Sequence, residues 1–359
     1  MTPIAPMLEI TDAILEAGGK SLHECIQCGT CASVCPWNEV SDYSPRHMIH
    51  EVSLGIEGYE VEALWKCVTC NTCVSRCPRG IDIVDVVHAA RATMLEMGSA
   101  PAAYRGPLAS MTSDGNPWNG NAEDRMKWAD GLGLQVYAPD NEYMYFTCCT
   151  QAFDPRNKPV AKILTGLLRD AGVDFGISGP DAVCCGDQAR KVGGESTFEA
   201  LKEKNLAKFS DGAVDKMIVA SPHCLNAFLK DYAPDIKGME VEHYCVTLDR
   251  LISNGAIKPD KEVACFVTFH DPCYLGRHNG IYDEPRRVLE AVPGVSLVEM
   301  EHTREASLCC GGGGGGLWLE VDKEQRFAVL RVQEALDAGA DTIATACPYC
   351  TVMLEDAVK

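Results

Sequence analysis

The organisation of this chain is decided by three carboxyl-terminal stretches, HDPC at 270–273, CCGGGGGG at 309–316 and CPYC at 347–350. They bring together five cysteines, namely Cys273, Cys309, Cys310, Cys347 and Cys350. Five thiolates exceed what one tetrahedral zinc ion or one ordinary [4Fe-4S] cubane accepts, so the set predicts a multinuclear iron-sulfur centre. The six glycines fit this prediction, because backbone without Cβ atoms can come close to a bulky inorganic core.

Two cysteine runs near the amino end share one spacing, CIQCGTCASVCP at 25–36 and CVTCNTCVSRCP at 67–78. In bacterial two-cluster ferredoxins, three close cysteines bind one cubane and a fourth, placed before proline, binds the other. The runs therefore predict two [4Fe-4S] clusters, one held by Cys25, Cys28, Cys31 and Cys77 and one by Cys67, Cys70, Cys73 and Cys35. Two zinc sites are a poorer explanation, because zinc does not require a fourth cysteine at this offset.

Composition limits the class of protein. A chain of 359 residues exceeds the size at which one hydrophobic core stops growing, so two or three domains are expected. The net charge of -19 opposes binding to nucleic acid or anionic lipid. Neither an apolar run long enough for a membrane span nor a basic secretory start is found, which predicts a cytoplasmic protein that is at most peripheral to a membrane complex. The 20 cysteines are accordingly expected to bind metal rather than to form secreted disulfides.

Residue patterns divide the chain into four parts. Residues 1–98 hold the two ferredoxin runs among helical patterns, and residues 99–140, rich in Gly, Pro and Asn but with two tryptophans, predict an ordered connector. Strand-like and helix-like segments then alternate, which predicts α/β domains at 141–256 and 257–359. The expected fold class is multidomain α+β: an N-terminal helical two-cluster ferredoxin module followed by two duplicated α/β cysteine-rich domains.

The two α/β halves follow one plan. Alignment pairs Cys149 with Cys273, Cys184 and Cys185 with Cys309 and Cys310, and Cys224 with Cys350. Where the second half has CPYC, the first has SPHC at 221–224, so Ser221 stands in place of one cysteine. Three possibilities stay open for the first half: a [4Fe-4S] cluster on Cys149, Cys184, Cys185 and Cys224, a five-ligand site completed by Cys148 or His223, or a purely structural site.

Some polar and thiol side chains lie outside these sets. His270, Asp271 and Arg277 flank the first cysteine of the C-terminal set, where they could donate protons, hold an anionic substrate or only orient the loop. The remaining thiols, whose default role is packing, are Cys148, Cys245 and Cys265.

A single cysteine, then CCG, then CxxC, found twice after a two-cluster ferredoxin module, resembles the heterodisulfide reductase family in its fused form. HDPCYLGR (270–277), SLCCGGGGG (307–315) and ACPYC (346–350) carry the resemblance, which covers nearly the whole chain. It implies that the C-terminal set binds a noncubane [4Fe-4S] cluster, made of a [3Fe-4S] and a [2Fe-2S] unit that share an iron and a sulfide. Family members hold a disulfide substrate between two such clusters. Only one complete set is present here, so one noncubane centre with relay clusters is expected.

The expected function is that of an oxidoreductase subunit that passes electrons through the ferredoxin cubanes to the noncubane cluster, with thiol, disulfide or small-molecule chemistry there. No GxGxxG follows a strand, so the chain is expected to bind no flavin and to receive electrons from other redox subunits, a flavoprotein among them. Related subunits suggest two alternatives, a flavin-dependent lactate or glycolate dehydrogenase and a pure electron conduit in an anaerobic complex such as tungsten benzoyl-CoA reductase. A zinc-stabilised scaffold is a third class.

Overall fold

The computed structural model describes residues 6–41, 43–56 and 63–359. Within these ranges the amino-terminal module consists of α1 (Leu8–Glu16), η1 (Lys20–Glu24), α2 (Thr30–Ser33), η2 (Pro36–Glu39), α3 (Pro45–Leu54), α4 (Ala63–Lys66), α5 (Thr72–Ser75) and α6 (Ile83–Glu96). The one-turn helices α2 and α5 occupy equal positions in the two cysteine runs. Each follows a residue in the left-handed region, Gly29 at φ 86° and Asn71 at φ 68°, so the two runs fold alike.

Helix α6 is the centre of this helical module. Its apolar side chains are buried along most of its length, and Val87 packs in one cluster with Ile14 of α1 and Ile49 of α3. Asp82 caps the helix, because its Oδ1 accepts the Asp85 N–H at 3.0 Å. The prediction of a helical module is confirmed.

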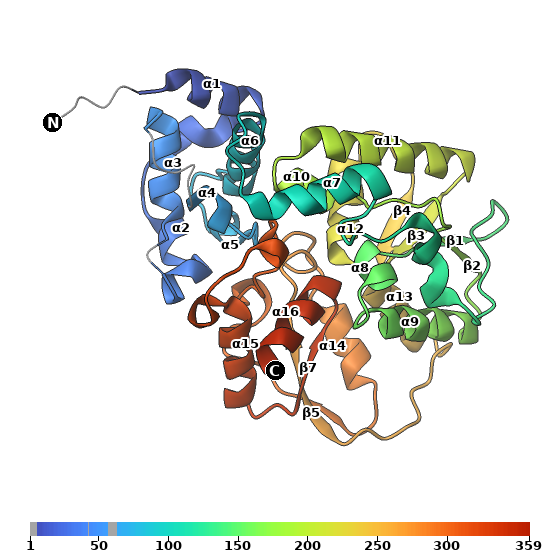
Figure 1. Cartoon of the computed structure of the whole chain (residues 1–359). Helices are drawn as coiled ribbons and strands as arrows, with labels where there is room; N and C mark the ends of the chain where they lie inside the picture. Colours follow the sequence, from blue (N-terminus) through green and yellow to red (C-terminus); the bar gives the residue numbers. More distant parts are fainter. Residues whose placement is uncertain (1–5, 42, 57–62) are drawn as a thin grey trace.

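Residues 99–140 run from α6 to the first sheet and pack on it. They form η3 (Ala102–Tyr104), α7 (Arg105–Asp114) and η4 (Ala122–Ala129), and α7 crosses from the helical module to the first α/β part (Figure 1). Trp128 is 1% exposed and packs beside Tyr145, with ring centroids 6.5 Å apart. Val136 pairs with Ile177 as an isolated parallel bridge. This segment is thus ordered against the first sheet rather than a tether.

The first α/β repeat is built on a four-stranded parallel sheet with the order β2-β1-β3-β4. Its elements are β1 (Tyr143–Phe146), α8 (Cys149–Phe153), α9 (Lys158–Asp170), β2 (Phe175–Ile177), α10 (Asp187–Lys191), α11 (Glu195–Asp211), β3 (Lys216–Val219), α12 (Pro222–Asn226), η5 (Ala227–Asp231), β4 (Glu240–His243) and α13 (Tyr244–Ser253). Tyr145 in the central strand β1 registers with Ile177 and Ile218. Helices α9 and α11 cover the sheet from opposite sides (Figure 1).

The second repeat keeps the same plan with three parallel strands in the order β6-β5-β7. Its elements are β5 (Cys265–His270), α14 (Asp283–Glu290), β6 (Val295–Leu297), η6 (Arg304–Ala306), η7 (Gly316–Trp318), η8 (Lys323–Gln325), α15 (Phe327–Asp337), β7 (Thr342–Thr345) and α16 (Pro348–Val358). Strands β5, β6 and β7 correspond to β1, β2 and β3, which confirms the duplicated α/β architecture. Parallel strands end at one edge of a sheet, so the cysteine-bearing loops that follow them converge.

One buried arginine joins the three parts of the molecule. The guanidinium of Arg91, on α6 and 0% exposed, donates hydrogen bonds of 2.7 to 3.1 Å to the main-chain carbonyls of Leu64, Trp65, Cys67, Lys191 and Gly314. Three of these carbonyls belong to the helical module, one to the first repeat and one to the second. Because a buried charged donor is costly to leave unsatisfied, Arg91 fixes how the three parts meet.

Helix length bears on membrane insertion. The longest of the described helices, α11, has 17 residues and carries several lysines and glutamates. In the described parts of the chain, no helix has both the length and the apolar character needed to cross a lipid bilayer.

Candidate iron-sulfur sites

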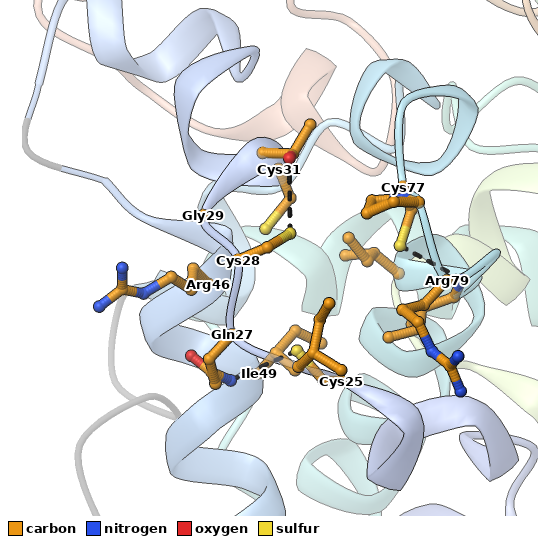
Figure 2. A pocket seen from close by; sticks show the side chains of 14 residues that line it. Cys25, Gln27, Cys28, Gly29, Cys31, Arg46, Ile49, Cys77 and Arg79 are labelled. Atoms are coloured by element: carbon orange, nitrogen blue, oxygen red, sulfur yellow. Dashed lines mark hydrogen bonds between the residues drawn. The ribbon is translucent and has the colours of Figure 1, made fainter.

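The first ferredoxin set lies near the surface of the helical module. Figure 2 shows one hollow lined by Cys25, Cys28, Cys31, Cys77, Arg46, Ile49 and Arg79. Cys77 reaches this hollow from the second run, so the structure gathers the four cysteines that the spacing grouped. Gln27 Nε2 donates to Cys25 Sγ at 3.4 Å, and Thr30 Oγ1 lies 3.4 Å from Cys28 Sγ. Hydrogen bonds from Thr30 lower the pKa of Cys28 and favour the thiolate that iron binds.

The second ferredoxin set lies deeper. Its members, close enough for their charges to interact, are Cys35, Cys67, Cys70 and Cys73, with Cys35 coming from the first run. Burial, and then the charges of the neighbouring thiolates, raise the pKa of Cys35 and Cys73. Buried thiols that oppose one another's ionisation need a cation to compensate them, and an iron-sulfur core supplies one. The donor set therefore fits a [4Fe-4S] cluster.

The C-terminal five-cysteine set forms a continuous row of buried thiols at the ends of β5 and β7. Cys273 Sγ lies 4.0 Å from Cys309 Sγ, and Cys310 Sγ lies 3.2 Å from Cys350 Sγ. Cys309 contacts Cys310, and Cys347 contacts Cys350. The row therefore runs in the order Cys273, Cys309, Cys310, Cys350 and Cys347, and every member is a free thiol. More sulfur is assembled here than one mononuclear metal ion can use.

His270, at the end of β5, faces this row. One of its ring nitrogens lies within 4.8 Å of the Cys310 and Cys350 sulfurs. Arg331 Nε donates to Nδ1 at 3.2 Å, which places the ring proton on Nε2, and Nε2 is buried without a hydrogen-bond partner among the described residues. Burial and the Arg331 charge lower the pKa of His270 to about 3, so the ring is neutral. A neutral ring with one unsatisfied N–H is suited to donate to a sulfur of a bound cluster.

Asp271 and Arg277 have different surroundings. The carboxylate of Asp271 is 2% exposed and accepts bonds of 2.7 and 2.9 Å from Arg286, which anchors the loop after β5. Arg277 Nε donates to the Cys70 carbonyl at 2.7 Å, and its Nη1 donates to the Ser307 carbonyl at 2.6 Å. Arg277 thus lies between the second ferredoxin set and the C-terminal set.

The hexaglycine segment lies against the loop of the second ferredoxin set. Gly314 has φ 56°, and a Cβ there would lie 2.6 Å from the Cys67 carbonyl oxygen. A Cβ on Gly313 would lie 2.5 Å from the carbonyl oxygen of Val68. Side chains at these positions would therefore push the helical module away from the second repeat. Glycine is required at these two positions because the backbone of the ferredoxin loop lies against them. The sequence alone did not show this contact.

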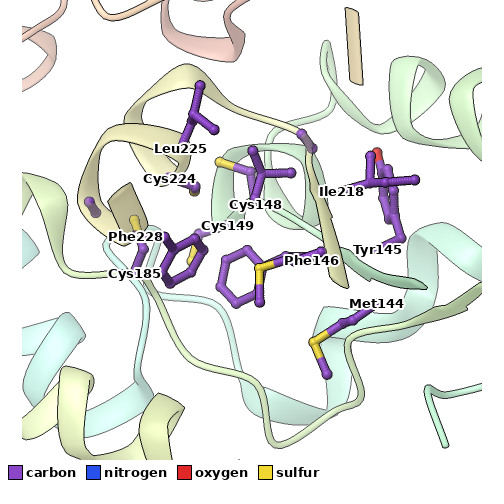
Figure 3. Packing of buried hydrophobic residues seen from close by; sticks show 14 of the residues in the cluster. Met144, Tyr145, Phe146, Cys148, Cys149, Cys185, Ile218, Cys224, Leu225 and Phe228 are labelled. Atoms are coloured by element: carbon purple, nitrogen blue, oxygen red, sulfur yellow. The ribbon is translucent and has the colours of Figure 1, made fainter. Parts of the chain in front are cut away.

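The first repeat assembles a second row of buried thiols. Its members, each in contact with the next, are Cys149, Cys184, Cys185 and Cys224. Cys148 also contacts Cys224, and Figure 3 shows both beside Cys149 and Cys185 in the core of this repeat. Arg125, from the segment before β1, places Nη1 3.5 Å from Cys149 Sγ. The first repeat therefore contains enough thiols for a cluster.

His223 crosses from the first repeat to the second. Its Nδ1 lies 2.9 Å from Asp187 Oδ2, and its ring packs against Tyr274 and Tyr349 at centroid distances of 4.1 and 4.7 Å. The side chain also contacts Cys347. Burial lowers the pKa of His223, but Asp187 and the Cys347 thiolate outweigh it and raise the pKa to about 10. Sequence alone assigned His223 to its own repeat, because nothing in the SPHC motif signals a partner more than a hundred residues away.

Two thiols stay apart from these rows. Cys245 is buried on α13 beside Tyr244, and burial raises the pKa of Cys245 to about 12. Cys265 is half-buried at the start of β5. Neither contacts a row, and both stay predicted packing residues.

The fold and the cysteine sets define an iron-sulfur protein with one two-cluster ferredoxin domain and two cysteine-rich domains. Family models match the same segments. Residues 21–81 match the 4Fe-4S dicluster domain, and residues 143–229 and 267–355 each match the Cysteine-rich domain, CCG.

Curated relatives narrow this class. A subunit of the dihydromethanophenazine:CoB--CoM heterodisulfide reductase from Methanosarcina acetivorans is 30% identical over 97% of this chain and 76% of its own length. The probable iron-sulfur-binding oxidoreductase FadF of Bacillus subtilis is 36% identical, and the EtfAB:quinone oxidoreductase of Syntrophomonas wolfei is 34% identical, over 76% and 77% of this chain. This chain spans 40% and 41% of those two proteins. It belongs to the heterodisulfide reductase-like family of iron-sulfur oxidoreductases.

Proposed function

We propose that this chain relays electrons within a heterodisulfide reductase-like complex, through two ferredoxin cubanes to a noncubane [4Fe-4S] cluster in the second repeat. The proposed ligands are Cys25, Cys28, Cys31 and Cys77; Cys67, Cys70, Cys73 and Cys35; and Cys273, Cys309, Cys310, Cys347 and Cys350. A further [4Fe-4S] cluster is assigned to Cys149, Cys184, Cys185 and Cys224. When bound, these clusters supply one-electron transfer.

The junction between the second ferredoxin set and the C-terminal set carries this proposal. Cys70, Cys273 and Cys309 belong to one buried apolar cluster, so the two sets meet in a common core. Arg277 holds the Cys70 carbonyl at 2.7 Å, and the glycines bring the two backbones together. A packed junction excludes water and keeps the two sets in a fixed relation, as electron relay requires.

The ends of this relay differ in exposure. Cys28 of the first set is exposed, whereas all cysteines of the two repeats' rows are buried. A partner subunit can therefore exchange electrons with the first ferredoxin set without opening the molecule. The chemistry of the complex is proposed at the buried C-terminal set, where a thiol, a disulfide or another small molecule would react.

Three side chains are assigned roles at that set. His270 would donate a hydrogen bond from its Nε2–H to a sulfur of the cluster or of a substrate, since this N–H has no other partner among the described residues. Arg277 would stabilise negative charge on the thiolates, because its guanidinium is buried beside Cys273 and Cys309. Asp271 would act indirectly, by holding the loop through Arg286.

The partners are proposed to be other redox subunits, a flavoprotein among them. The support is that relatives are named as a subunit of heterodisulfide reductase and as an EtfAB:quinone oxidoreductase. An iron-sulfur subunit of a lactate or glycolate dehydrogenase, and an electron conduit in a complex such as tungsten benzoyl-CoA reductase, use the same relay and stay as alternatives.

Metal analysis of anaerobically purified protein tests the relay. We expect about sixteen iron and sixteen acid-labile sulfide per chain, about four per cluster. Cys309→Ser should remove the C-terminal centre from the Mössbauer and EPR spectra and spare the two ferredoxin cubanes, and Cys265→Ser serves as the matched control. Zinc without acid-labile sulfide would contradict the proposal.

Substrate titration separates chemistry at the noncubane centre from pure conduction. Thiols or disulfides that react there should perturb the EPR signal of the C-terminal centre in the wild-type protein and not in Cys309→Ser. A signal that no thiol or disulfide changes favours the conduit.

A further inference from the structure

We propose that Cys148 is the fifth thiolate of the first repeat, and that this repeat holds a five-thiolate iron-sulfur centre rather than a four-cysteine cubane. The inference rests on the proposed function, because it assumes that the repeats bind iron-sulfur clusters at all. It assigns a ligand where the SPHC motif lacks one.

The order of thiol contacts carries the assignment. In the second repeat the row ends with Cys350 contacting Cys347. In the first repeat Cys224 stands in the place of Cys350, and the thiol that it contacts at the end of the row is Cys148. The two rows therefore have equal length and equal order, although their last members come from different strands: Cys347 follows β7, whereas Cys148 follows β1.

At two corresponding positions the repeats differ in which one carries the cysteine. By the alignment of Cys149 with Cys273, Cys148 corresponds to Pro272. By the alignment of Cys224 with Cys350, Ser221 corresponds to Cys347. Each repeat thus has one cysteine at one of these two positions and a residue that cannot bind iron well at the other. If the first repeat had simply lost a ligand at Ser221, there would be no reason to expect a cysteine at position 148.

The backbone conformation at both positions is compatible with the residue that the other repeat has there. Ser221 has φ -141° and ψ 135°, and Cys347 has φ -138° and ψ 126°, so the two residues start their helices in the same conformation. Cys148 has φ -58°, which lies in the range that proline imposes at Pro272. Ser221 Oγ accepts the His223 N–H at 3.3 Å and is used as a helix cap.

The other proposed completion of the site, His223, is directed elsewhere. Its Nδ1 faces Asp187, and its side chain contacts Cys347 of the second repeat. Arg125 adds an independent sign that the first row holds an anionic group. Its guanidinium is 2% exposed, reaches Cys149 and the Thr147 carbonyl, and forms no salt bridge with a carboxylate of the described residues. A thiolate-bound iron-sulfur centre, which carries net negative charge, would balance this buried cation.

The test removes the C-terminal centre first, so that only the first repeat can show a noncubane spectrum. The background variant is Cys309→Ser, studied as the full anaerobic chain by Mössbauer and EPR spectroscopy. We expect this variant to keep a noncubane spectrum, and the added change Cys148→Ser to abolish it while both ferredoxin signals stay. Cys245→Ser in the same background is the control, because that thiol is buried but lies outside the row.

A second variant covers the case in which Cys148→Ser disturbs folding. The double change Cys148→Pro with Ser221→Cys gives the first repeat the residues of the second, and we expect it to restore the noncubane spectrum that Cys148→Ser loses. If Cys309→Ser shows only cubanes, or if Cys148→Ser leaves the spectrum unchanged, Cys148 is not a ligand and the inference fails while the relay stands. If the wild-type chain binds only about eight iron, both repeats are empty and the proposed function itself fails.

Discussion

The first and second cysteine-rich repeats share one sheet plan, and they differ in what surrounds their thiol rows. At the end of the central strand the second repeat has His270, whose ring lies near two sulfurs and whose Nε2 has no hydrogen-bond partner among the described residues, whereas the first has Phe146. Cys273 and Cys309 of the second row share a core with Cys70 of the ferredoxin module, while all the thiols of the first row lie in the large core built on the first sheet. In the proposed relay, the row that receives electrons first therefore also has the polar side chain.

The arginines beside the two rows show the same contrast. Arg277 in the second repeat bonds to a carbonyl of the ferredoxin module, whereas Arg125, from the segment before β1, bonds to the Thr147 carbonyl of the first repeat. A cation thus lies beside the first cysteine of each row, although the two arginines occupy different places in the chain, and only Arg277 joins two domains. In the proposed relay the second repeat therefore receives electrons from the ferredoxin module, and the first repeat follows it.

The largest expected effect comes from removing one sulfur from the second row, with the matching change in the first row as the comparison. Cys310→Ser should abolish reduction of the C-terminal centre, with a loss of at least about a hundredfold in electron delivery, because loss of a direct ligand exceeds the 10- to 100-fold cost of outer-shell changes. Cys185→Ser at the matching position should leave that delivery within about twofold, since the first row lies beyond the junction. Stopped-flow reduction by dithionite measures both. Equal losses would contradict the order of the two rows.

The second-largest effect is expected on stability, from removal of Arg91, which joins both repeats to the ferredoxin module. Arg91→Met leaves five buried carbonyls without their charged donor. We expect a loss of about 3–5 kcal/mol in the free energy of unfolding, measured by anaerobic denaturant titration of the loaded protein. Arg76→Met, at an exposed position of the same module, is the control and should cost less than about 0.5 kcal/mol. A similar small loss in both variants would show that Arg91 does not join the parts.

The stability of the buried contact between the two repeats should depend on pH, because His223 is part of this contact. Its pKa is raised to about 10 in the folded chain, against an ordinary value of about 6.5, so its stabilisation is fully present below pH ~6.5 and is lost as the pH rises toward 10. The thermal midpoint of the wild-type protein should fall over this interval. His223→Gln should flatten the profile, with a loss on the order of 2 kcal/mol at neutral pH. An unchanged slope in His223→Gln would assign the pH dependence to other groups.

Exchanging the residue at the strand end tests whether His270 distinguishes the second row. His270→Phe copies the first repeat at this position and removes a hydrogen-bond donor to sulfur. The reduction potential of the C-terminal centre should fall, because such donors stabilise the more negative, reduced cluster. Redox titration followed by EPR measures the change, and Phe146→Leu in the first repeat serves as the control that should leave it unmoved. A higher potential in His270→Phe would contradict the assigned role.

The smallest effect is expected at an exposed ion pair between the two repeats. Arg156 Nη1 lies 2.7 Å from Asp356 Oδ1, with 53% of the Asp356 side chain exposed. Asp356→Ala should change the free energy of unfolding by less than about 1 kcal/mol, because solvent screens exposed ion pairs. Comparison with His223→Gln, measured by the same thermal unfolding, should show that the repeats are held together by buried contacts. A larger loss in Asp356→Ala would reverse that ranking.

Much of the fold followed from local patterns. The two ferredoxin runs, the duplication and the alternation of strands and helices could be predicted because cluster ligation and secondary structure depend on spacings of a few residues. The loss of a cysteine at Ser221 was also visible, since the second repeat provides the comparison within the same chain.

Other features were not predictable from spacing. The glycines after Cys310 suggested an approach to an inorganic core, and the structure shows Gly313 and Gly314 against the backbone of Cys67 and Val68. Arg91 gave no signal at all, because its partners are main-chain carbonyls, which every residue possesses.

The sequence by itself determined which chemistry this protein can hold, because thiolates at fixed intervals select iron-sulfur clusters regardless of their surroundings. Only the tertiary structure decided how the sets connect. Cys148 meets Cys224, His223 meets Cys347, and Arg277 meets Cys70 across separations of 76, 124 and 207 residues. Such contacts arise where parallel strands end at a common edge and where whole domains pack together, and no local pattern encodes them.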